Sequence, residues 1–432
     1  MPIIIGLNSS ELMLQRRSVS INTLALVGGN VGSLLLAFAL SVIIGRGLGQ
    51  VGLGVYVAVL AWVFPLLMLA EFGTNTLLTR DLAKSPADTP AYLNAVAPLR
   101  YRIGAGLGVL LFLAAPMLSD NPTVITGLRV SAPLLLIEPS YGAYTAVLRA
   151  HQAMLPIPLL NVGMLIVQVL GSLLIIDVGG DAVALLALNT ITSLLRMIGA
   201  WWAYRRGGYG NGVVGQVPSG LVARALPFAV AGVLAALHMR LNVLLIAPIS
   251  GVAAVGVYAA GMRFIEAARV VPAAYYDAIL PKLAAMPKPQ FTMRYTPHVF
   301  TDEVNAGVWL MAIYGLLVGV GATLAGPTFV RWTYGGDFSA SVQVLVLAAW
   351  LLGFALVSEL WLVREYASGL EWKVNRALIL MLAVGVGLGV LVIPQWGVLG
   401  AVLAWWLAEV VGLVSLTTGG LTGALRVGLG EA

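Results

Sequence analysis

The chain is 432 residues long; 60% of its residues are hydrophobic, 10% are charged, and its formal net charge is +6. Soluble domains carry about 25% charged residues, so this composition excludes an ordinary soluble enzyme and indicates an all-α membrane protein. Because the sequence contains no cysteine, disulfides and thiolate metal sites are excluded as well.

The apolar segments predict about twelve transmembrane helices. Windows such as Asn22–Gly45 and Val51–Ala70 contain no Lys, Arg, Asp or Glu. About 20 apolar residues in a helix cross a hydrocarbon layer of roughly 30 Å. In chain order the predicted helices are residues 20–45, 51–73, 103–120, 130–149, 155–177, 182–204, 223–248, 251–280, 304–327, 338–363, 376–394 and 396–417.

The positive charges predict the orientation of these helices. Lys and Arg are concentrated in alternate loops, whereas the other set of loops holds only Arg46, Arg129 and Arg331. Because cytoplasmic loops carry the excess of Lys and Arg, both termini are predicted to be cytoplasmic. The charges are dispersed along the chain instead of forming one basic surface, which argues against a nucleic-acid partner.

The sequence predicts no catalytic centre. Its three histidines, His151, His238 and His298, do not form a pair with metal-ligand spacing, so neither a metal site nor a catalytic residue is expected. No P-loop sequence occurs, and no loop is long enough for an attached catalytic domain. We therefore expect a protein that is not an enzyme and has no cofactor. Active transport would then use a gradient, such as that of H⁺ or Na⁺, or a partner protein.

An internal repeat divides the chain into two halves. Residues 49–84 align without a gap on residues 251–286, at an offset of 202. The strongest match is between Gly54-Val55-Tyr56 and Gly256-Val257-Tyr258. The repeat pairs the second predicted helix with the eighth, which predicts two pseudo-symmetric six-helix lobes, residues 1–210 and 211–432. Parallel repeats around a central cavity are typical of transporters.

At the junction of the first two helices the sequence resembles a known family. The segment Gly45–Tyr56 is similar to the "GR-LG---G-Y" pattern of bacterial polysaccharide flippases, and Ile249–Tyr258 repeats part of it. The turns Leu148–Gln152 and Glu365–Gly369 resemble two further turns of that family. The flippases belong to the multidrug/oligosaccharidyl-lipid/polysaccharide (MOP) exporter superfamily, and the likeness of helix number and loops covers nearly the whole chain.

The resemblance implies a fold like that of the multidrug (MATE) exporters and a function in making cell-surface polysaccharide. The substrate would be an oligosaccharide on a polyprenyl (pyro)phosphate, moved from the cytoplasmic to the outer leaflet. The resemblance also implies the plasma membrane of a bacterium or archaeon, with membrane lipids, a polysaccharide polymerase and glycosyltransferases as partners.

The eighth predicted helix carries the main candidate substrate site. Arg263, Glu266 and Arg269 are three residues apart and share one helical face near mid-membrane. Charges at this depth usually face a cavity or pair with one another. In one interpretation the two arginines bind an anionic headgroup and Glu266 holds their side chains. In the other, the three residues form a structural ladder within the helix.

The seventh predicted helix adds His238, Arg240 and Asn242. His238 and Asn242 are four residues apart and share a face, whereas Arg240 points to the opposite side. Arg240 is therefore either a further cavity residue or a residue whose charged end extends to the outer interface. His238 is either a packing residue or a proton carrier, and the sequence leaves both alternatives open.

In the first lobe the candidate is Glu138, which lies mid-span between Pro133 and Pro139. Proline frees backbone groups and marks a bend, so a central carboxylate here suits a substrate or ion site, or a buried structural pair. Arg196 and Glu359 are interpreted as interfacial charges near the cytoplasmic helix ends, as is Glu71.

Two functions fit this pattern. The first is a flippase of lipid-linked oligosaccharides, and the alternative is an ion-coupled multidrug exporter of the same superfamily. An exporter of cations needs a cavity dominated by carboxylates. The predicted mid-membrane set contains more arginine than carboxylate, which favours an anionic substrate. Its members are Arg240, Arg263 and Arg269, against Glu138 and Glu266.

Overall fold

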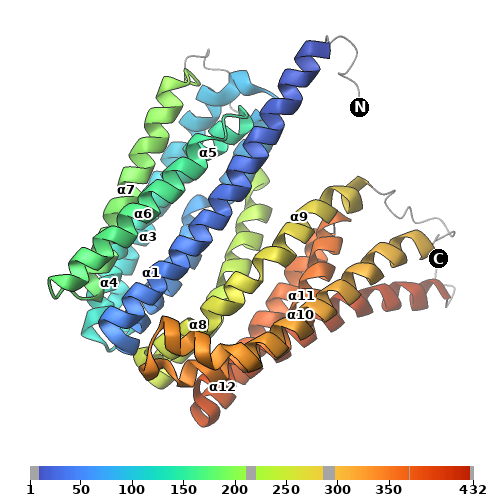
Figure 1. Cartoon of the computed structure of the whole chain (residues 1–432). Helices are drawn as coiled ribbons and strands as arrows, with labels where there is room; N and C mark the ends of the chain where they lie inside the picture. The colour runs from blue at the N-terminus through green and yellow to red at the C-terminus, as the bar shows by residue number, and fades with distance from the viewer. Residues whose placement is uncertain (1–8, 211–219, 286–296, 369, 429–432) are drawn as a thin grey trace. The chain divides into compact units, whose positions relative to one another are not determined.

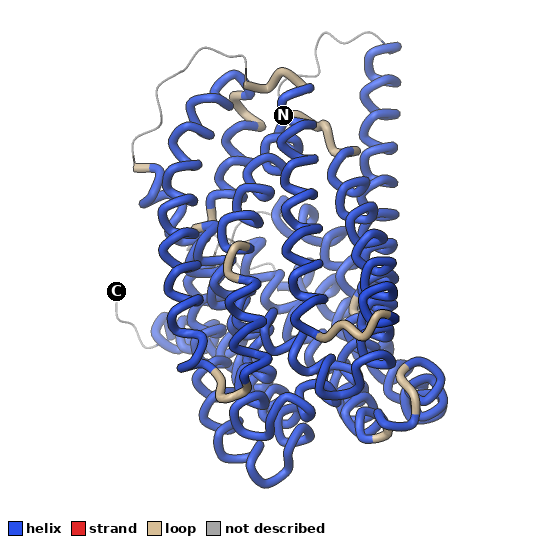
Figure 2. The backbone as a smooth tube through the Cα atoms, turned by 90° about the vertical axis from the view of Figure 1, so that its left-hand side faces the viewer, coloured by secondary structure: helices blue, strands red, loops and turns tan. Residues whose placement is uncertain are grey.

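The computed structural model describes residues 9–210, 220–285, 297–368 and 370–428, and over these residues the chain is helical with short turns and no strand (Figures 1 and 2). The α-helices are α1 Ser9–Glu71, α2 Thr74–Leu82, α3 Thr89–Leu118, α4 Pro122–Ser131, α5 Leu134–Ala150, α6 Pro156–Asp177, α7 Ala182–Arg206, α8 Leu221–Ala268, α9 Val270–Ala285, α10 Pro297–Thr333, α11 Ala340–Ala367 and α12 Glu371–Gly428. Two short 3₁₀ turns, Pro86–Asp88 and Gly336–Phe338, precede α3 and α11.

Three of the helices are long enough to make two membrane crossings each. Among the described residues eight helices are long and apolar enough to span a membrane, and α1, α8 and α12 contribute stretches of 44, 48 and 46 residues. At 1.5 Å per residue these stretches are roughly 65–70 Å long, about twice the hydrocarbon layer. Together with the interrupted α4–α5 segment, they provide helices for all twelve predicted spans.

Each long helix is divided by one glycine with a positive φ. The φ angles are 66° at Gly49, 83° at Gly251 and 56° at Gly397. A residue with a Cβ is disfavoured in this backbone conformation, which explains why glycine occupies the breaks. Gly49 and Gly251 are also the first aligned pair of the predicted repeat, so the two copies share the same break.

The segment predicted to bend at proline is broken there. α4 ends at Ser131, Ala132 and Pro133 form a turn, and α5 contains Pro139. Proline at position 139 has no N–H to donate to the carbonyl of Leu135. That carbonyl lies against Gly104 of α3, where a Cβ would collide with it. The glycine therefore allows α3 to approach the bend closely.

The eighth predicted helix is two helices. α8 ends at Ala268 and α9 begins at Val270, so the expected continuous span of residues 251–280 is interrupted at Arg269. The cause is Pro272, which cannot donate to the carbonyl of Ala268. Instead, the Tyr314 hydroxyl of α10 donates to this carbonyl at 2.6 Å. Arg269 lies at the interruption, where its N–H still donates to the carbonyl of Ile265 at 3.0 Å.

α3 begins earlier than the sequence predicts. It starts at Thr89, whereas hydropathy places the span at residues 103–120 and leaves Arg100 in a cytoplasmic loop. The prediction is wrong because hydropathy identifies the apolar part of a helix only. Arg100 is 2% exposed within the helix, and its charge is accommodated by hydrogen bonds that hydropathy does not detect.

The two turns singled out by the family resemblance end their helices in the same way. After α5, Ala153 N–H donates to the carbonyl of Leu148 at 2.9 Å, and Gln152 has a positive φ of 57°. After α11, Leu370 N–H donates to the carbonyl of Glu365 at 3.0 Å. A bond from residue i to residue i−5 is the mark of a Schellman motif, which satisfies carbonyls left free at a helix end.

The contacts of the chain divide it into two compact units. Unit 1 comprises Met1–Leu40, Leu66–Pro116 and Leu128–Val230, and unit 2 comprises Ser41–Pro65, Met117–Gly127 and Ala231–Ala432. Because each unit combines separate stretches of chain, this division is not the one predicted from the repeat. Whether residues 1–210 and 211–432 act as two lobes stays a prediction.

Within unit 2, the segment Ser41–Pro65 of α1 is attached through polar groups at the end of α10. Ser41 and Tyr334 share a hydrogen bond of 2.9 Å between their hydroxyls. The Arg46 guanidinium donates to the carbonyls of Trp332 and Thr333. The last carbonyls of a helix have no partner within it, so a cation is favourable there. The arginine of the "GR-LG---G-Y" pattern thus stabilises the end of another helix.

The two copies of the repeat contact each other reciprocally in unit 2. A Cβ on Gly54 would collide with the backbone of Val252, and a Cβ on Gly256 would collide with the carbonyl of Gln50. These two contacts are equivalent under the offset of 202 residues. A reciprocal contact between equivalent residues is what a two-fold relation produces. The glycines of the motif are therefore needed for close helix packing.

Candidate functional site

The central feature of unit 2 is a cluster of charged residues on the two arms of α8, which we name the α8 cluster. Arg263 Nη1 and Glu266 Oε2 are 2.6 Å apart, and their side chains are 30% and 45% exposed. The Arg240 guanidinium lies 4.9 Å from the centre of the Phe64 ring, within electrostatic range of both charged residues. The cluster thus contains two guanidinium groups and one carboxylate, which gives it a net positive charge.

The α8 cluster lies near the middle of a membrane crossing. Arg263 is twelve residues beyond the break at Gly251, so it lies roughly 18 Å along the second arm of α8. A charge pair this deep that remains partly exposed is costly against lipid tails, and it is tolerated where it faces water or a polar ligand. The exposure of Arg263 and Glu266 is therefore what a binding site requires.

Arg269 forms a separate pair from the α8 cluster. Its Nη2 lies 2.7 Å from Glu359 Oε2 of α11, whereas Glu266 pairs with Arg263. The predicted ladder of Arg263, Glu266 and Arg269 within one helix is therefore not formed. Glu359, which the sequence assigns to the interface, is instead the partner of a candidate site residue.

His238 and Asn242 also find partners inside unit 2. His238 Nε2 lies 3.1 Å from Glu409 Oε1 of α12, and both side chains are nearly buried. His238 Nδ1 forms no hydrogen bond with the described residues. Asn242 donates to the Tyr258 hydroxyl at 2.8 Å. The two residues that share a helical face therefore contact two different helical segments.

Arg240 lies among the side chains of unit 2. Besides its position over Phe64, its Nε atom is buried and forms no hydrogen bond with the described part of the chain. An arginine extended to the outer interface would instead place its guanidinium in water. The contacts therefore favour the alternative in which Arg240 belongs with Arg263 and Glu266.

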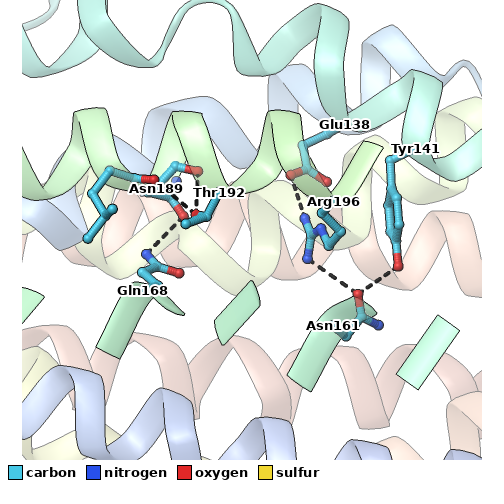
Figure 3. A network of polar contacts seen from close by, with 8 residues as sticks. Glu138, Tyr141, Asn161, Gln168, Asn189, Thr192 and Arg196 are labelled. Carbon is cyan, nitrogen blue, oxygen red and sulfur yellow. Dashed lines mark hydrogen bonds and ion pairs between the residues drawn. The ribbon is translucent and has the colours of Figure 1, made fainter. Parts of the chain in front are cut away.

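In unit 1, Glu138 is part of a polar network that joins α5, α6 and α7 (Figure 3). Glu138 Oε1 and Arg196 Nη2 are 2.5 Å apart. Asn161 Oδ1 accepts from the Tyr141 hydroxyl at 2.6 Å, and Arg196 lies over the Tyr141 ring, with the guanidinium carbon 4.6 Å from the centroid. Arg196, which the sequence analysis interprets as an interfacial charge, is thus the partner of Glu138.

A second network extends along α7 in the same view. Gln168 of α6 donates to Asn189 Oδ1 at 3.1 Å, and the Thr192 hydroxyl donates to the carbonyls of Leu188 and Asn189 (Figure 3). The polar residues of α6 and α7 therefore face one another. Pairing of this kind removes unsatisfied polar groups from the hydrocarbon region.

Sequence analysis missed the buried cation Arg100. Its Nε donates to the Thr74 hydroxyl at 2.8 Å, its Nη2 donates to Asn75 Oδ1 at 2.7 Å, and its Nη1 donates to the carbonyl of Pro139. Glu71, assigned to the interface, is the carboxylate within electrostatic range. Arg100 lies at the polar edge of an apolar stretch. At such a position the local sequence does not distinguish an arginine in a loop from a buried arginine.

The arrangement of the α8 cluster suits the binding of an anion. Within the described residues there is no group of three or more His, Cys, Asp or Glu side chains that could hold a metal ion. The α8 cluster instead presents guanidinium groups, which bind carboxylates and phosphates through paired hydrogen bonds.

Comparison with known proteins identifies the family. The model of the family described as "Polysaccharide biosynthesis protein" matches residues 19–286, which is more than half of the chain. The chain belongs to this family. A comparison with the curated proteins finds no significant match.

Solved structures show that the fold is that of the MOP superfamily. The chain resembles the lipid II flippase MurJ in an inward closed conformation, with a TM-score of 0.72. The two sequences are 12% identical, and the match covers 92% of this chain and 87% of MurJ. It also resembles an inward-facing multidrug-resistance MATE transporter, with a TM-score of 0.69 and 16% identity over 94% and 100% of the two chains. A MOP transporter from Pyrococcus furiosus matches with a TM-score of 0.59 and 16% identity over 95% of each chain. The predicted fold class and the resemblance to a polysaccharide biosynthesis family are thereby confirmed.

Proposed function

We propose that this polysaccharide biosynthesis protein is a flippase for an oligosaccharide linked to a polyprenyl (pyro)phosphate. It moves the glycan from the cytoplasmic to the outer leaflet of the plasma membrane, with both termini in the cytoplasm. Glycosyltransferases supply its substrate and a polymerase uses the product. Family membership and the likeness to MurJ, a lipid II flippase, support this proposal.

The observation that carries the proposal is the net positive α8 cluster at mid-membrane depth. Arg240 and Arg263 flank one carboxylate, Glu266, and the Arg263–Glu266 pair remains partly exposed. In this proposal the phosphate of the substrate takes the place of solvent beside the two guanidinium groups. The proposed binding residues also include His238, Asn242 and Arg269. Glu138 is the proposed binding residue of the first lobe.

The alternative of a cation exporter is less well supported. A site for organic cations needs surplus negative charge, and the α8 cluster has the opposite sign. Reversed polarity of the binding pocket has been taken to suggest a different function for the Pyrococcus furiosus transporter. We apply the same reasoning here, so that a positive cluster favours an anionic substrate. Coupling of transport to an H⁺ or Na⁺ gradient is compatible with either function.

The proposal is tested by replacing one arginine at a time and measuring both the surface glycan of the cells and the abundance of the variant protein in the membrane. Arg240→Gln, Arg263→Gln and Arg269→Gln should each abolish surface glycan at normal abundance. A charge-assisted hydrogen bond contributes about 1.5–3 kcal/mol, so the loss of one weakens binding by about one to two decades. Arg→Lys keeps the charge but not the planar fork, so we expect partial activity. Arg331→Gln, at an exposed helix end, is the matched control.

Double substitutions separate substrate binding from a structural ion pair. If Arg263 only stabilises Glu266, then Arg263→Gln should lower protein abundance and Arg263→Gln/Glu266→Gln should restore both abundance and surface glycan. The same test applies to Arg269 with Glu359. Full surface glycan at normal abundance in Arg240→Gln and Arg263→Gln would show that the headgroup assignment is wrong and would favour the exporter.

A further inference from the structure

Unit 1 contains a cavity that the proposed substrate site does not include. Its volume is about 330 Å³, at the small end of the range of roughly 300–1,000 Å³ for small-molecule sites. It lies between α3, α5 and α7, near the end of α7 that carries Arg205 and Arg206. The side chains on which its chemistry depends are Arg100, Tyr101, Tyr144, Trp201, Tyr204 and Arg205.

Aromatic rings form much of the wall of this cavity. The rings of Tyr144 and Tyr204 have centroids 5.4 Å apart and are tilted by 37°. Trp201 and Tyr101 add two further aromatic side chains, both partly exposed. Aromatic faces pack against the apolar C–H face of a sugar ring, while the phenol hydroxyls hydrogen-bond with its hydroxyl groups. The cavity, at about 330 Å³, is large enough for one such ring.

The charge of the cavity selects an anion. Arg100 is buried in its wall, and its described hydrogen-bond acceptors are hydroxyl, amide and carbonyl oxygens. Arg205 lies over the Trp201 ring at 5.5 Å and forms no ion pair with the described residues. None of the described residues that line the cavity is Asp or Glu. Glu71 offsets part of the Arg100 charge, so Arg205 is the cation available to a ligand.

We propose that this cavity binds one sugar ring bearing an acidic group, either a carboxylate or a phosphate. The ring stacks on the aromatic wall and its anionic group contacts Arg205. This inference rests on the proposed function and specifies its substrate class as an acidic glycan. The cavity would hold the glycan on the predicted cytoplasmic side, apart from the α8 cluster that takes the lipid-linked phosphate.

The test is direct binding to the purified protein in nanodiscs of a zwitterionic lipid. The acidic probes are glucuronate, galacturonate and glucose 6-phosphate. Glucose is the probe for the ring without the charge, and inorganic phosphate is the probe for the charge without the ring. Saturation-transfer NMR and calorimetry report the affinities. We expect at least one acidic sugar to bind about tenfold or more tightly than both glucose and phosphate.

Neighbouring residues provide matched controls. Arg205→Gln should weaken binding of that sugar about tenfold or more, whereas Arg206→Gln should not, because Arg206 lies over Trp202 and does not line the cavity. Likewise, Trp201→Leu should weaken binding of the ring and Trp202→Leu should not. All four side chains are exposed, so these changes should leave folding intact.

Several results would overturn the proposal. Equal binding of glucose and every acidic sugar would remove the role of charge. Equal binding of phosphate, or loss of sugar binding when the nanodiscs are prepared with an anionic lipid instead, would identify a phosphate or lipid headgroup site. Equal effects of Arg205→Gln and Arg206→Gln would place the ligand elsewhere. Because binding is measured without transport, failure here is distinct from failure of the flippase proposal, which depends on surface glycan in the α8-cluster variants.

Discussion

At the scale of single residues, the structure pairs the charges that the sequence leaves as separate candidates. Glu138 and Arg196 are 58 positions apart in the chain and form one ion pair. Breaking an ion pair away from water leaves an uncompensated charge, which costs more than removing both charges. The pair therefore allows a test of whether Glu138 is structural or binds an ion.

For a structural pair, Glu138→Gln and Arg196→Gln should each lower the melting temperature and abundance. The cost should be at most the roughly 3–5 kcal/mol of a fully buried pair. Glu138→Gln/Arg196→Gln should recover most of the loss. Thermal unfolding in detergent gives the comparison. If instead Glu138→Gln keeps normal stability but loses transport, Glu138 has a role in binding or ion coupling.

A second residue-scale prediction concerns Asp81, at the end of α2 outside the predicted spans. Burial disfavours its charge, but hydrogen bonds from Arg80 and Tyr92 and the nearby Arg224 guanidinium outweigh burial and lower the pKa of Asp81. The ionised carboxylate thus stabilises the folded protein above the unfolded pKa of about 3.9. This contribution is lost as the pH falls through the lowered folded pKa.

Asp81→Asn should therefore reduce the free energy of unfolding at neutral pH by about 1 kcal/mol, which is the upper end of the range for partly exposed ion pairs. It should also make the free energy of unfolding depend less on pH under acidic conditions. Melting temperatures measured from pH 3 to pH 7 provide the readout. Asp88→Asn, in the same loop, is the control. An unchanged acid profile in Asp81→Asn would mean that this carboxylate does not contribute to stability.

At the scale of helices, glycine determines both where the chain turns and how closely its helices pack. Gly49 and Gly251 break their helices with the same positive φ, and Gly54 and Gly256 allow reciprocal contact between the repeats. The family resemblance at Gly45–Tyr56 therefore reflects local geometry in unit 2. It does not mark a ligand site.

Gly54→Val and Gly256→Val should both lower folded abundance, because the new side chains would collide with backbone atoms that cannot move without displacing a helix. Overpacking of this kind costs about 1–3 kcal/mol or more. Gly321→Val is the matched control, since a Cβ there meets open space. Abundance and thermal stability should separate the two classes. Equal tolerance at all three positions would contradict the close packing.

At the scale of the whole molecule, the distribution of Lys and Arg predicts the orientation in the membrane. Ser85 lies in a predicted cytoplasmic loop, Ser339 lies at the predicted outer end of the tenth predicted helix, and both are exposed. Since the chain has no cysteine, one can be introduced at each position in turn. Two further predicted cytoplasmic loops contain Ser219 and Thr292, which lie outside the described residues.

An impermeant thiol reagent added to intact cells should label Ser339→Cys and not Ser85→Cys. Both cysteines should react after the membrane is permeabilised, which controls for local accessibility. Labelling of Ser85→Cys in intact cells, with protection of Ser339→Cys, would reverse the predicted orientation and place both termini outside.

The sequence by itself determined the membrane class, the number of crossings and the positions of most breaks. These features depend on local quantities: the length of apolar segments, the missing N–H of proline and the left-handed backbone conformation that favours glycine. Hydropathy failed at Arg100, because a buried charge is tolerated through the hydrogen bonds that it donates to Thr74, Asn75 and Pro139 on other helices.

Only the tertiary structure decided which charges pair. Arg269 and Glu359 are 90 positions apart, and His238 and Glu409 are 171 positions apart. A helical period shows which residues share a face, but it contains no information about which face of a distant helix lies opposite. For the same reason, the cavity between α3, α5 and α7 could not be predicted from the sequence. Its aromatic and basic side chains come from three helices, and their convergence depends on packing.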